Sequence, residues 1–218
     1  MDLKIATSIL AGDFSRLGDE AKRIEESGAD SLHIDIMDGH FVPNLTIGPQ
    51  AVAAINRSTN LFLDVHLMIY NPYDYVERFV EAGADRITFH LEATEEVEGT
   101  LSYIRRCGIK AGLAFRPETT ETLIPKYLDQ CDMVLLMTVN PGFGGQDFIS
   151  DVLEKIRFTR DVCSKLSILM DIQVDGGIND KTAKLCVEAG ANVLVAGTYL
   201  FSFPEMREGV KILRNSRG

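Results

Sequence analysis

Residues 27–36 read Ser-Gly-Ala-Asp-Ser-Leu-His-Ile-Asp-Ile, a helix end followed by a strand, which is the unit from which we expect the fold to be built. Gly28 is the residue type that ends a helix in the left-handed conformation. The apolar run that follows it over residues 31–36 is typical of a buried parallel strand. The same signal returns at residues 82–85 (Ala-Gly-Ala-Asp) and 189–192 (Ala-Gly-Ala-Asn). The three copies indicate a chain built from repeated helix–strand units.

The spacing of these copies predicts eight units. Gly28 and Gly83 lie 55 residues apart, and Gly83 and Gly190 lie 107 apart, close to two and four units of about 27 residues, an eighth of the chain. Strands are expected at 3–7, 31–36, 61–67, 86–90, 110–115, 133–137, 168–174 and 192–196. Helices are expected at 14–27, 49–57, 72–82, 95–107, 119–128, 149–163, 180–189 and 204–213. We predict one α/β domain over residues 1–218, a closed (β/α)8 TIM barrel. An open doubly wound sheet is the alternative, although no G-x-G-x-x-G follows the first strand.

The composition excludes several classes of protein. The 218 residues include 22 Lys and Arg against 32 Asp and Glu, a net charge of −10, which argues against a nucleic acid or an acidic membrane as partner. No apolar run is long enough for a membrane span, and the first residues lack the apolar core of a signal peptide. Four scattered cysteines are expected to be free thiols in a reducing cytoplasm. We expect a cytoplasmic homo-oligomer, because barrel enzymes commonly associate through their helices.

Histidine and aspartate gather at the predicted strand ends. His33 and Asp35 share one face of a strand, and His66 and Asp175 end two other strands. Barrel interiors favour branched apolar side chains, so these inward polar groups need partners or a metal. Such a set suits one divalent ion, Zn, Fe(II), Mn or Co, with a hydrogen-bonded core cluster as the alternative. Asp64 lies one layer deeper and is expected to support a ligand by hydrogen bonding.

Glycine-rich turns follow the last three strands and suit a phosphate group. Asn-Pro-Gly-Phe-Gly-Gly-Gln occupies residues 140–146, Gly-Gly residues 176–177, and Gly-Thr residues 197–198. Backbone amides free of side chains can bind phosphate without a lysine, and barrels often hold phosphate after strands seven and eight. The alternative is that these glycines only form tight turns. We also expect residues 140–146 to act as a lid that excludes water.

The positions of the methionines and lysines bear on the kind of chemistry expected at the strand ends. Met37, Met68 and Met137 lie at three strand ends, where their sulfur atoms could shield a developing negative charge from water. Ordinary core packing is the alternative for each of them. No lysine stands at the carboxyl end of a predicted strand, which disfavours Schiff-base chemistry.

Long motifs make the chain similar to the ribulose-phosphate 3-epimerase family over almost its whole length. They lie at residues 8–10, 33–44, 64–68, 139–146, 174–178 and 195–197. The resemblance implies a barrel of the ribulose-phosphate-binding type. It also implies an isomerase that interconverts D-ribulose 5-phosphate and D-xylulose 5-phosphate by inversion at C3.

The resemblance also assigns roles by position. His33, Asp35, His66 and Asp175 would be the metal ligands. Asp35 and Asp175 would also be the acid/base pair, one removing the C3 proton to give a metal-stabilised cis-enediolate and the other returning a proton to the opposite face. Ser8 and His66 would contact the substrate. The remaining substrate contacts, chiefly to the phosphate, would come from Gly142, Phe143, Gly144, Gly145, Gly176, Gly177, Gly197 and Thr198.

Two departures from the family pattern leave the sugar open. Arg116 stands where the family often has Asn, and Thr198 where it commonly has Ser. We expect Arg116 to pair with Glu118 or to lie in solvent rather than to touch the substrate. One alternative function is a 3-epimerase of a hexulose phosphate such as D-allulose 6-phosphate. A more distant one is a phosphate-binding barrel without catalytic activity.

Overall fold

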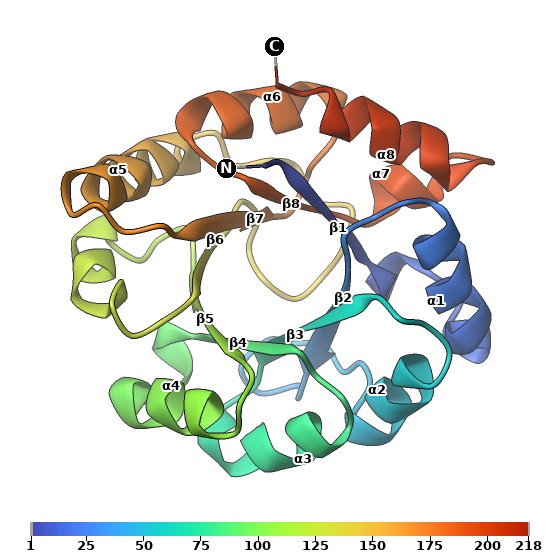
Figure 1. Ribbon diagram of the computed structural model, residues 1–218, viewed down its shortest axis with the longest axis horizontal. Coiled ribbons are helices and arrows are strands. Elements are labelled where there is room, and N and C mark those ends of the chain that lie inside the picture. Colours follow the sequence, from blue (N-terminus) through green and yellow to red (C-terminus); the bar gives the residue numbers. More distant parts are fainter. Residues whose placement is uncertain (1, 218) are drawn as a thin grey trace.

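The computed structural model describes residues 2–217 and contains a closed barrel of eight parallel strands in chain order (Figure 1). Strand β1 pairs with both β2 and β8, so the sheet has no free edge and the predicted (β/α)8 barrel is confirmed. The strands are β1 (Lys4–Ser8), β2 (Ser31–Met37), β3 (Phe62–Met68), β4 (Arg86–His90), β5 (Lys110–Phe115), β6 (Met133–Met137), β7 (Asp171–Asp175) and β8 (Val193–Ala196).

Helices surround the barrel (Figure 1). The α-helices are α1 (Leu17–Glu26), α2 (Pro49–Asn56), α3 (Val76–Glu81), α4 (Val97–Arg106), α5 (Val152–Lys165), α6 (Asp180–Ala189), α7 (Thr198–Phe201) and α8 (Met206–Arg214). Shorter 3-10 helices are η1 (Ile9–Ala11), η2 (Phe14–Arg16), η3 (Pro72–Tyr75), η4 (Leu91–Ala93) and η5 (Glu121–Tyr127). The stretch 119–128, expected as an ordinary helix, is the 3-10 helix η5, because Pro125 inside it lacks an N–H donor.

Strand β2 shows how the sequence separates core from site. All of its residues are buried. Leu32, Ile34 and Ile36 belong to the main hydrophobic core, which extends to apolar residues of the surrounding helices. Because side chains alternate along a strand, His33 and Asp35 point into the barrel. The outward face therefore stabilises the fold while the inward face carries the polar groups.

A buried ion pair occupies the barrel interior. Both carboxylate oxygens of Asp64 contact the Arg86 guanidinium, at 2.8 Å each. Asp64 Oδ2 also accepts a hydrogen bond from Gln173 Nε2 at 2.7 Å and lies 2.9 Å from His33 Nδ1. Burial opposes ionisation of Asp64, but the charge of Arg86 and the hydrogen bonds from His33 and Arg86 outweigh it and hold the carboxyl pKa well below its usual range. Asp64 is thus an ionised acceptor with its hydrogen-bonding capacity used.

Arg86→Met is expected to lower the free energy of unfolding by about 3–5 kcal/mol, because it leaves the Asp64 charge buried and unpaired. The matched control is Lys126→Met. Lys126 pairs with Glu98 on the surface at 2.7 Å, with side chains 59% and 47% exposed, so its loss should cost no more than about 1 kcal/mol. Urea unfolding of the two variants measures the difference. Equal losses would contradict the importance of the buried pair.

Candidate active site

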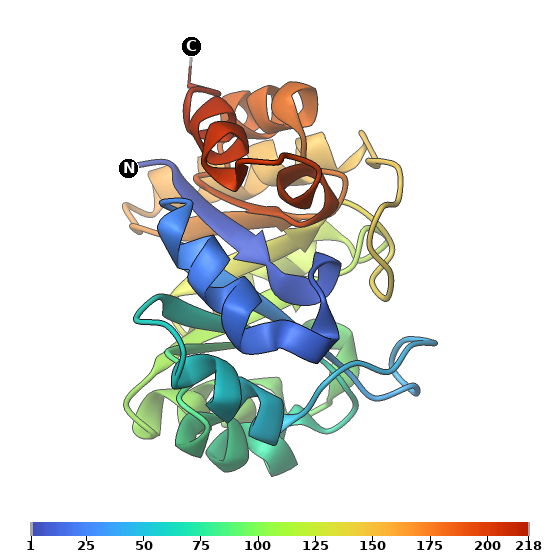
Figure 2. The same cartoon turned by 90° about the vertical axis from the view of Figure 1, so that its right-hand side faces the viewer.

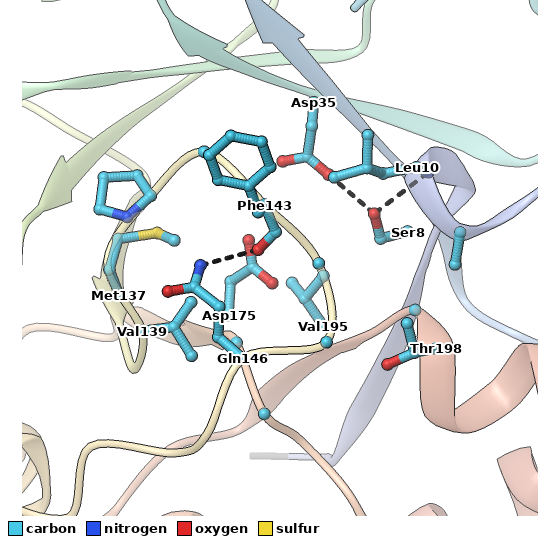
Figure 3. Close-up of a pocket in the computed structure, with 18 of the residues that line it drawn as sticks. Ser8, Leu10, Asp35, Met137, Val139, Phe143, Gln146, Asp175, Val195 and Thr198 are labelled. Atoms are coloured by element: carbon cyan, nitrogen blue, oxygen red, sulfur yellow. Dashed lines mark hydrogen bonds between the residues drawn. The ribbon is translucent and has the colours of Figure 1, made fainter. Parts of the chain in front are cut away.

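The carboxyl ends of the strands open into a cavity of about 230 Å³ (Figure 3). Most residues singled out from the sequence line it: Ser8, Asp35, Met37, Met68, Met137, Gly142, Phe143, Gly144, Gly145, Asp175, Gly176, Gly177, Gly197 and Thr198. His33 and His66 do not line it and are fully buried. The two histidines therefore lie behind the aspartates, which do reach the cavity.

Two histidines and two aspartates from three strands converge at the base of the cavity. One potential ligand atom from each of His33, Asp35, His66 and Asp175 lies within 4.8 Å of the others. Asp35 Oδ1 is 3.3 Å from His33 Nε2 and 3.1 Å from His66 Nδ1. Asp175 Oδ2 is 3.7 Å and 3.9 Å from the same two nitrogens.

The environment of His33 indicates what this cluster is for. Among the described residues, His33 Nε2 is buried without a hydrogen-bond partner. Its other nitrogen, Nδ1, faces the acceptor Asp64 and carries the proton of the neutral ring, so that in this form Nε2 has a lone pair aimed at the cluster. A buried unpaired acceptor beside two carboxylates fits a divalent cation better than a hydrogen-bonded core. The four residues can therefore hold one metal ion.

The two carboxyl groups of the cluster lie in different environments. Burial works against ionisation of Asp35, but His33 and His66 outweigh it and hold its pKa well below the usual range. Ser8 Oγ also donates a hydrogen bond to Asp35 Oδ2 at 2.7 Å (Figure 3). Burial and the Asp35 carboxylate raise the pKa of Asp175 to about 6. Carboxyl pairs whose pKa values are pushed apart are typical of acid/base sites.

His90 and Glu92 extend the cluster, and the sequence analysis did not single them out. His90 Nε2 lies 2.9 Å from His66 Nε2, and His90 Nδ1 lies 3.2 Å from Glu92 Oε2. Burial lowers the pKa of His90 to about 4, although Glu92 opposes the shift. The sequence did contain a signal for His90: it is a polar residue at the end of the predicted strand 86–90, just as Asp35 lies next to the end of the predicted strand 31–36.

Comparison with known proteins decides the family. The model of the ribulose-phosphate 3 epimerase family matches residues 4–201. The chain belongs to the ribulose-phosphate 3-epimerase family. Membership makes it an epimerase, within the isomerases, and agrees with the family predicted from the motifs.

Relatives in this family cover nearly the whole chain. The ribulose-phosphate 3-epimerase of Chlamydia muridarum (strain MoPn / Nigg) is 54% identical over 213 residues, which are 96% of this chain and 92% of that protein. That of Bacillus subtilis (strain 168) is 48% identical over 218 residues, 99% of this chain and 100% of that protein. A crystal structure of 3-hexulose-6-phosphate synthase superimposes with a TM-score of 0.74 at 16% identity, covering 99% of this chain and 100% of that one, and shows the shared fold.

Two loops of this epimerase-family barrel meet at the mouth of the cavity. The loop after β2 (residues 38–48) and the loop after β6 (residues 138–151) extend from the same end of the barrel (Figure 2). Asn44 Nδ2 donates to Gly142 O at 2.8 Å and joins them. Gln146 Nε2 donates to Asn140 O at 2.7 Å and to Phe143 O at 2.8 Å, which closes the second loop on itself. The segment predicted as a lid thus has a defined shape over the cavity.

Arg116, which departs from the usual family residue, does not line the cavity. Its Nη2 donates to Phe41 O at 2.9 Å, and its guanidinium carbon lies 4.2 Å from the centre of the Phe41 ring. Its Nη1 is 3.8 Å from Glu118 Oε1, the partner predicted for it. Arg116 therefore anchors the 38–48 loop.

Gly176→Ala is expected to destabilise the protein more than Gly28→Ala. Both glycines have a positive φ, +117° and +81°, so alanine is strained at either position, by about 1–2 kcal/mol. At Gly176 an added Cβ would also lie 2.3 Å from Val139 Cγ2, whereas at Gly28 no atom of residues 2–217 outside its chain neighbours lies within 4 Å of an added Cβ. Urea unfolding of both variants measures the steric contribution. A smaller loss at Gly176 than at Gly28 would contradict this packing.

Within residues 2–217, no helix is both long and apolar enough to cross a membrane.

Proposed function

We propose that the chain interconverts D-ribulose 5-phosphate and D-xylulose 5-phosphate by inverting the configuration at C3. The observation that carries the proposal is the pair Asp35 and Asp175. These carboxyl groups come from strands β2 and β7, line the same cavity and meet at one cluster with His33 and His66. Family membership supports the substrate, because relatives 54% and 48% identical are named ribulose-phosphate 3-epimerase.

The two carboxyl groups supply the two proton transfers that inversion requires. One carboxylate removes the C3 proton beside the ketone, and the electron pair of that C–H bond moves toward the ketone oxygen. The carbon becomes planar in the resulting enediolate. The other carboxyl group then donates its proton to the opposite face of C3 and the ketone is restored. Asp35 and Asp175 end with their protonation states exchanged, and the reverse reaction or solvent resets them.

His33, Asp35, His66 and Asp175 would hold one divalent ion. Two nitrogen and two carboxylate ligands suit Zn, Fe(II), Mn or Co. Such an ion would act as a Lewis acid that stabilises negative charge on the substrate oxygens. The unpaired Nε2 of His33 supports this assignment, as does the orientation that Asp64 imposes on the same ring.

The glycine-rich turns after β7 and β8 would receive the phosphate. Gly176, Gly177, Gly197 and Thr198 line the cavity together with the loop from Gly142 to Gly145. Among the residues that the structure describes, no lysine or arginine lines this cavity, so backbone amides and the Thr198 hydroxyl would supply the hydrogen bonds. Ser8 would contact the sugar, and it also orients Asp35 through a 2.7 Å hydrogen bond. His66 does not line the cavity, so it would influence the substrate only through the ion that it helps to hold.

Apolar groups at the mouth would protect the enediolate from water. Met37, Met68 and Met137 line the cavity and are almost fully buried. Their polarisable sulfur atoms would lie beside the reacting sugar without competing for its proton. The 140–146 loop, with Phe143 52% exposed, would close over the substrate.

The substrate proposal is tested by comparing kcat/KM for D-ribulose 5-phosphate and D-allulose 6-phosphate on the same metal-loaded protein. We expect the pentulose phosphate to be the better substrate. A preference for the hexulose phosphate would move the assignment to that substrate with the chemistry unchanged. No epimerisation of either, with metal shown to be bound, would contradict the proposed function.

A further inference from the structure

A chain of hydrogen-bonded side chains runs from the cluster toward η4. His66 Nε2 contacts His90 Nε2 at 2.9 Å, and His90 Nδ1 contacts Glu92 Oε2 at 3.2 Å. The other oxygen of Glu92 accepts from the backbone N–H of Arg116 at 3.0 Å and from Thr119 Oγ1. Both histidines are fully buried. No step of the proposed function uses His90 or Glu92.

The hydrogen-bonding capacities of these groups determine which group donates and which accepts in each hydrogen bond. A carboxylate can only accept, so His90 Nδ1 must donate to Glu92. A neutral imidazole carries one N–H, and His90 Nε2 is then an acceptor. The 2.9 Å contact between the two Nε2 atoms holds one proton, which must come from His66. His66 Nδ1 is left with a lone pair that faces the cluster.

Asp35 opposes the arrangement in which His66 carries its proton on Nε2. Its Oδ1 lies 3.1 Å from His66 Nδ1, which in the absence of a cation favours a proton on that nitrogen. On a neutral His66, a proton there would reverse both bonds and leave His90 Nδ1 and Glu92 Oε2 as two acceptors facing each other. Glu92 therefore disfavours the form of His66 that cannot bind a metal. Asp64 does the same for His33 through a direct contact of 2.9 Å.

We propose that Glu92, acting through His90, selects the His66 tautomer that binds a metal and so tightens metal binding. Glu92 and His90 are positioning residues in this account, because neither touches the reacting atoms. The inference rests on the proposed metal site. Groups that orient metal-bound histidines typically contribute 10–100-fold to affinity in other proteins.

Glu92→Gln should reverse the donor and acceptor roles in the hydrogen bonds that join residue 92, His90 and His66. The Arg116 backbone N–H can only donate, so the amide oxygen of the new side chain must face it and the NH2 group must face His90 Nδ1. His90 then donates to His66, and the proton of His66 moves to Nδ1. The matched control is Glu118→Gln, which removes the same charge in the neighbouring turn from a side chain that is 63% exposed. Thr119→Val removes one hydrogen bond to Glu92 but keeps the carboxylate.

The test is titration of the metal-free proteins with Co(II), followed by its visible absorption, in competition with a chelator. We expect Glu92→Gln to bind Co(II) about 10–100-fold more weakly than the wild type, and Glu118→Gln and Thr119→Val to bind within about twofold of it. Equal affinity for Glu92→Gln, or an equal loss for Glu118→Gln, would overturn the inference. A wild type that binds no Co(II) would instead refute the metal site itself, and the inference with it.

A measurement on the wild type alone keeps the inference testable if Glu92→Gln does not fold. Nitrogen-15 NMR distinguishes the two tautomers of a histidine. In the metal-free wild type we expect His66 to carry its proton on Nε2, and in Glu92→Gln on Nδ1. A proton on Nδ1 in the wild type would overturn the proposed role of Glu92. A purely structural role would change unfolding without changing this signal.

Discussion

Asp175→Asn is expected to lower kcat for epimerisation by about 10²–10⁴-fold, because an amide cannot exchange a proton with C3. The cavity and the fold should remain, since the substitution is nearly isosteric. Asp35 stays in place, and it retains its hydrogen bond from Ser8. The variant therefore isolates one of the two proposed proton transfers.

Isotope exchange in D2O shows which transfer has been lost. A protein with only one functional carboxylate should still exchange the C3 proton of one epimer for deuterium without inverting it. Asp175→Asn should retain this C3 exchange on one epimer only, and Asp35→Asn should retain it on the other epimer only. Asp171→Asn is the control, because Asp171 lies at the other end of β7 and pairs with Lys4 at 2.8 Å. Retained inversion in Asp175→Asn, or loss of activity in the control, would contradict the two-carboxylate account.

His66→Ala is expected to remove metal binding and to lower kcat by about 10³-fold, since a Lewis acid contributes several kcal/mol to stabilising the transition state. His66 is fully buried, and its Nδ1 lies 3.1 Å from Asp35 Oδ1 and 3.9 Å from Asp175 Oδ2. His40→Ala is the matched control, because His40 is exposed in the loop after β2.

Metal content by elemental analysis and kcat on the same samples separate the two variants. His40→Ala should match the wild type in both measurements. A His66→Ala protein that keeps a full equivalent of metal and its activity would show that the cluster is not the metal site. Loss of metal in both variants would point to a site that includes the loop instead.

Much of this architecture could be predicted from local sequence. The repeated Gly-Ala signal gave the period of the barrel, and alternation along a strand placed His33 and Asp35 on its inward face. Parallel register then aligns Asp35 with His66 and His33 with Asp64, so Asp64 lies one layer deeper, as predicted. The strand ends had to meet once the barrel closed.

Contacts between side chains on different loops could not be predicted in the same way. Arg116 sits on Phe41, 75 residues away, and no local pattern encodes that pairing. His90 ends an apolar run and resembles a core residue until His66 and Glu92 are seen on either side of it. The homo-oligomer, the cytoplasmic location and the single domain over residues 1–218 stay predictions.

Metal-dependent inversion of a pentulose phosphate can be measured in a single assay. Metal-stripped protein is mixed with D-ribulose 5-phosphate, with and without Zn(II), Fe(II), Mn(II) or Co(II), and formation of D-xylulose 5-phosphate is followed. We predict negligible turnover without metal and restored turnover with at least one of these ions. Undiminished turnover by protein shown to be free of metal would contradict it.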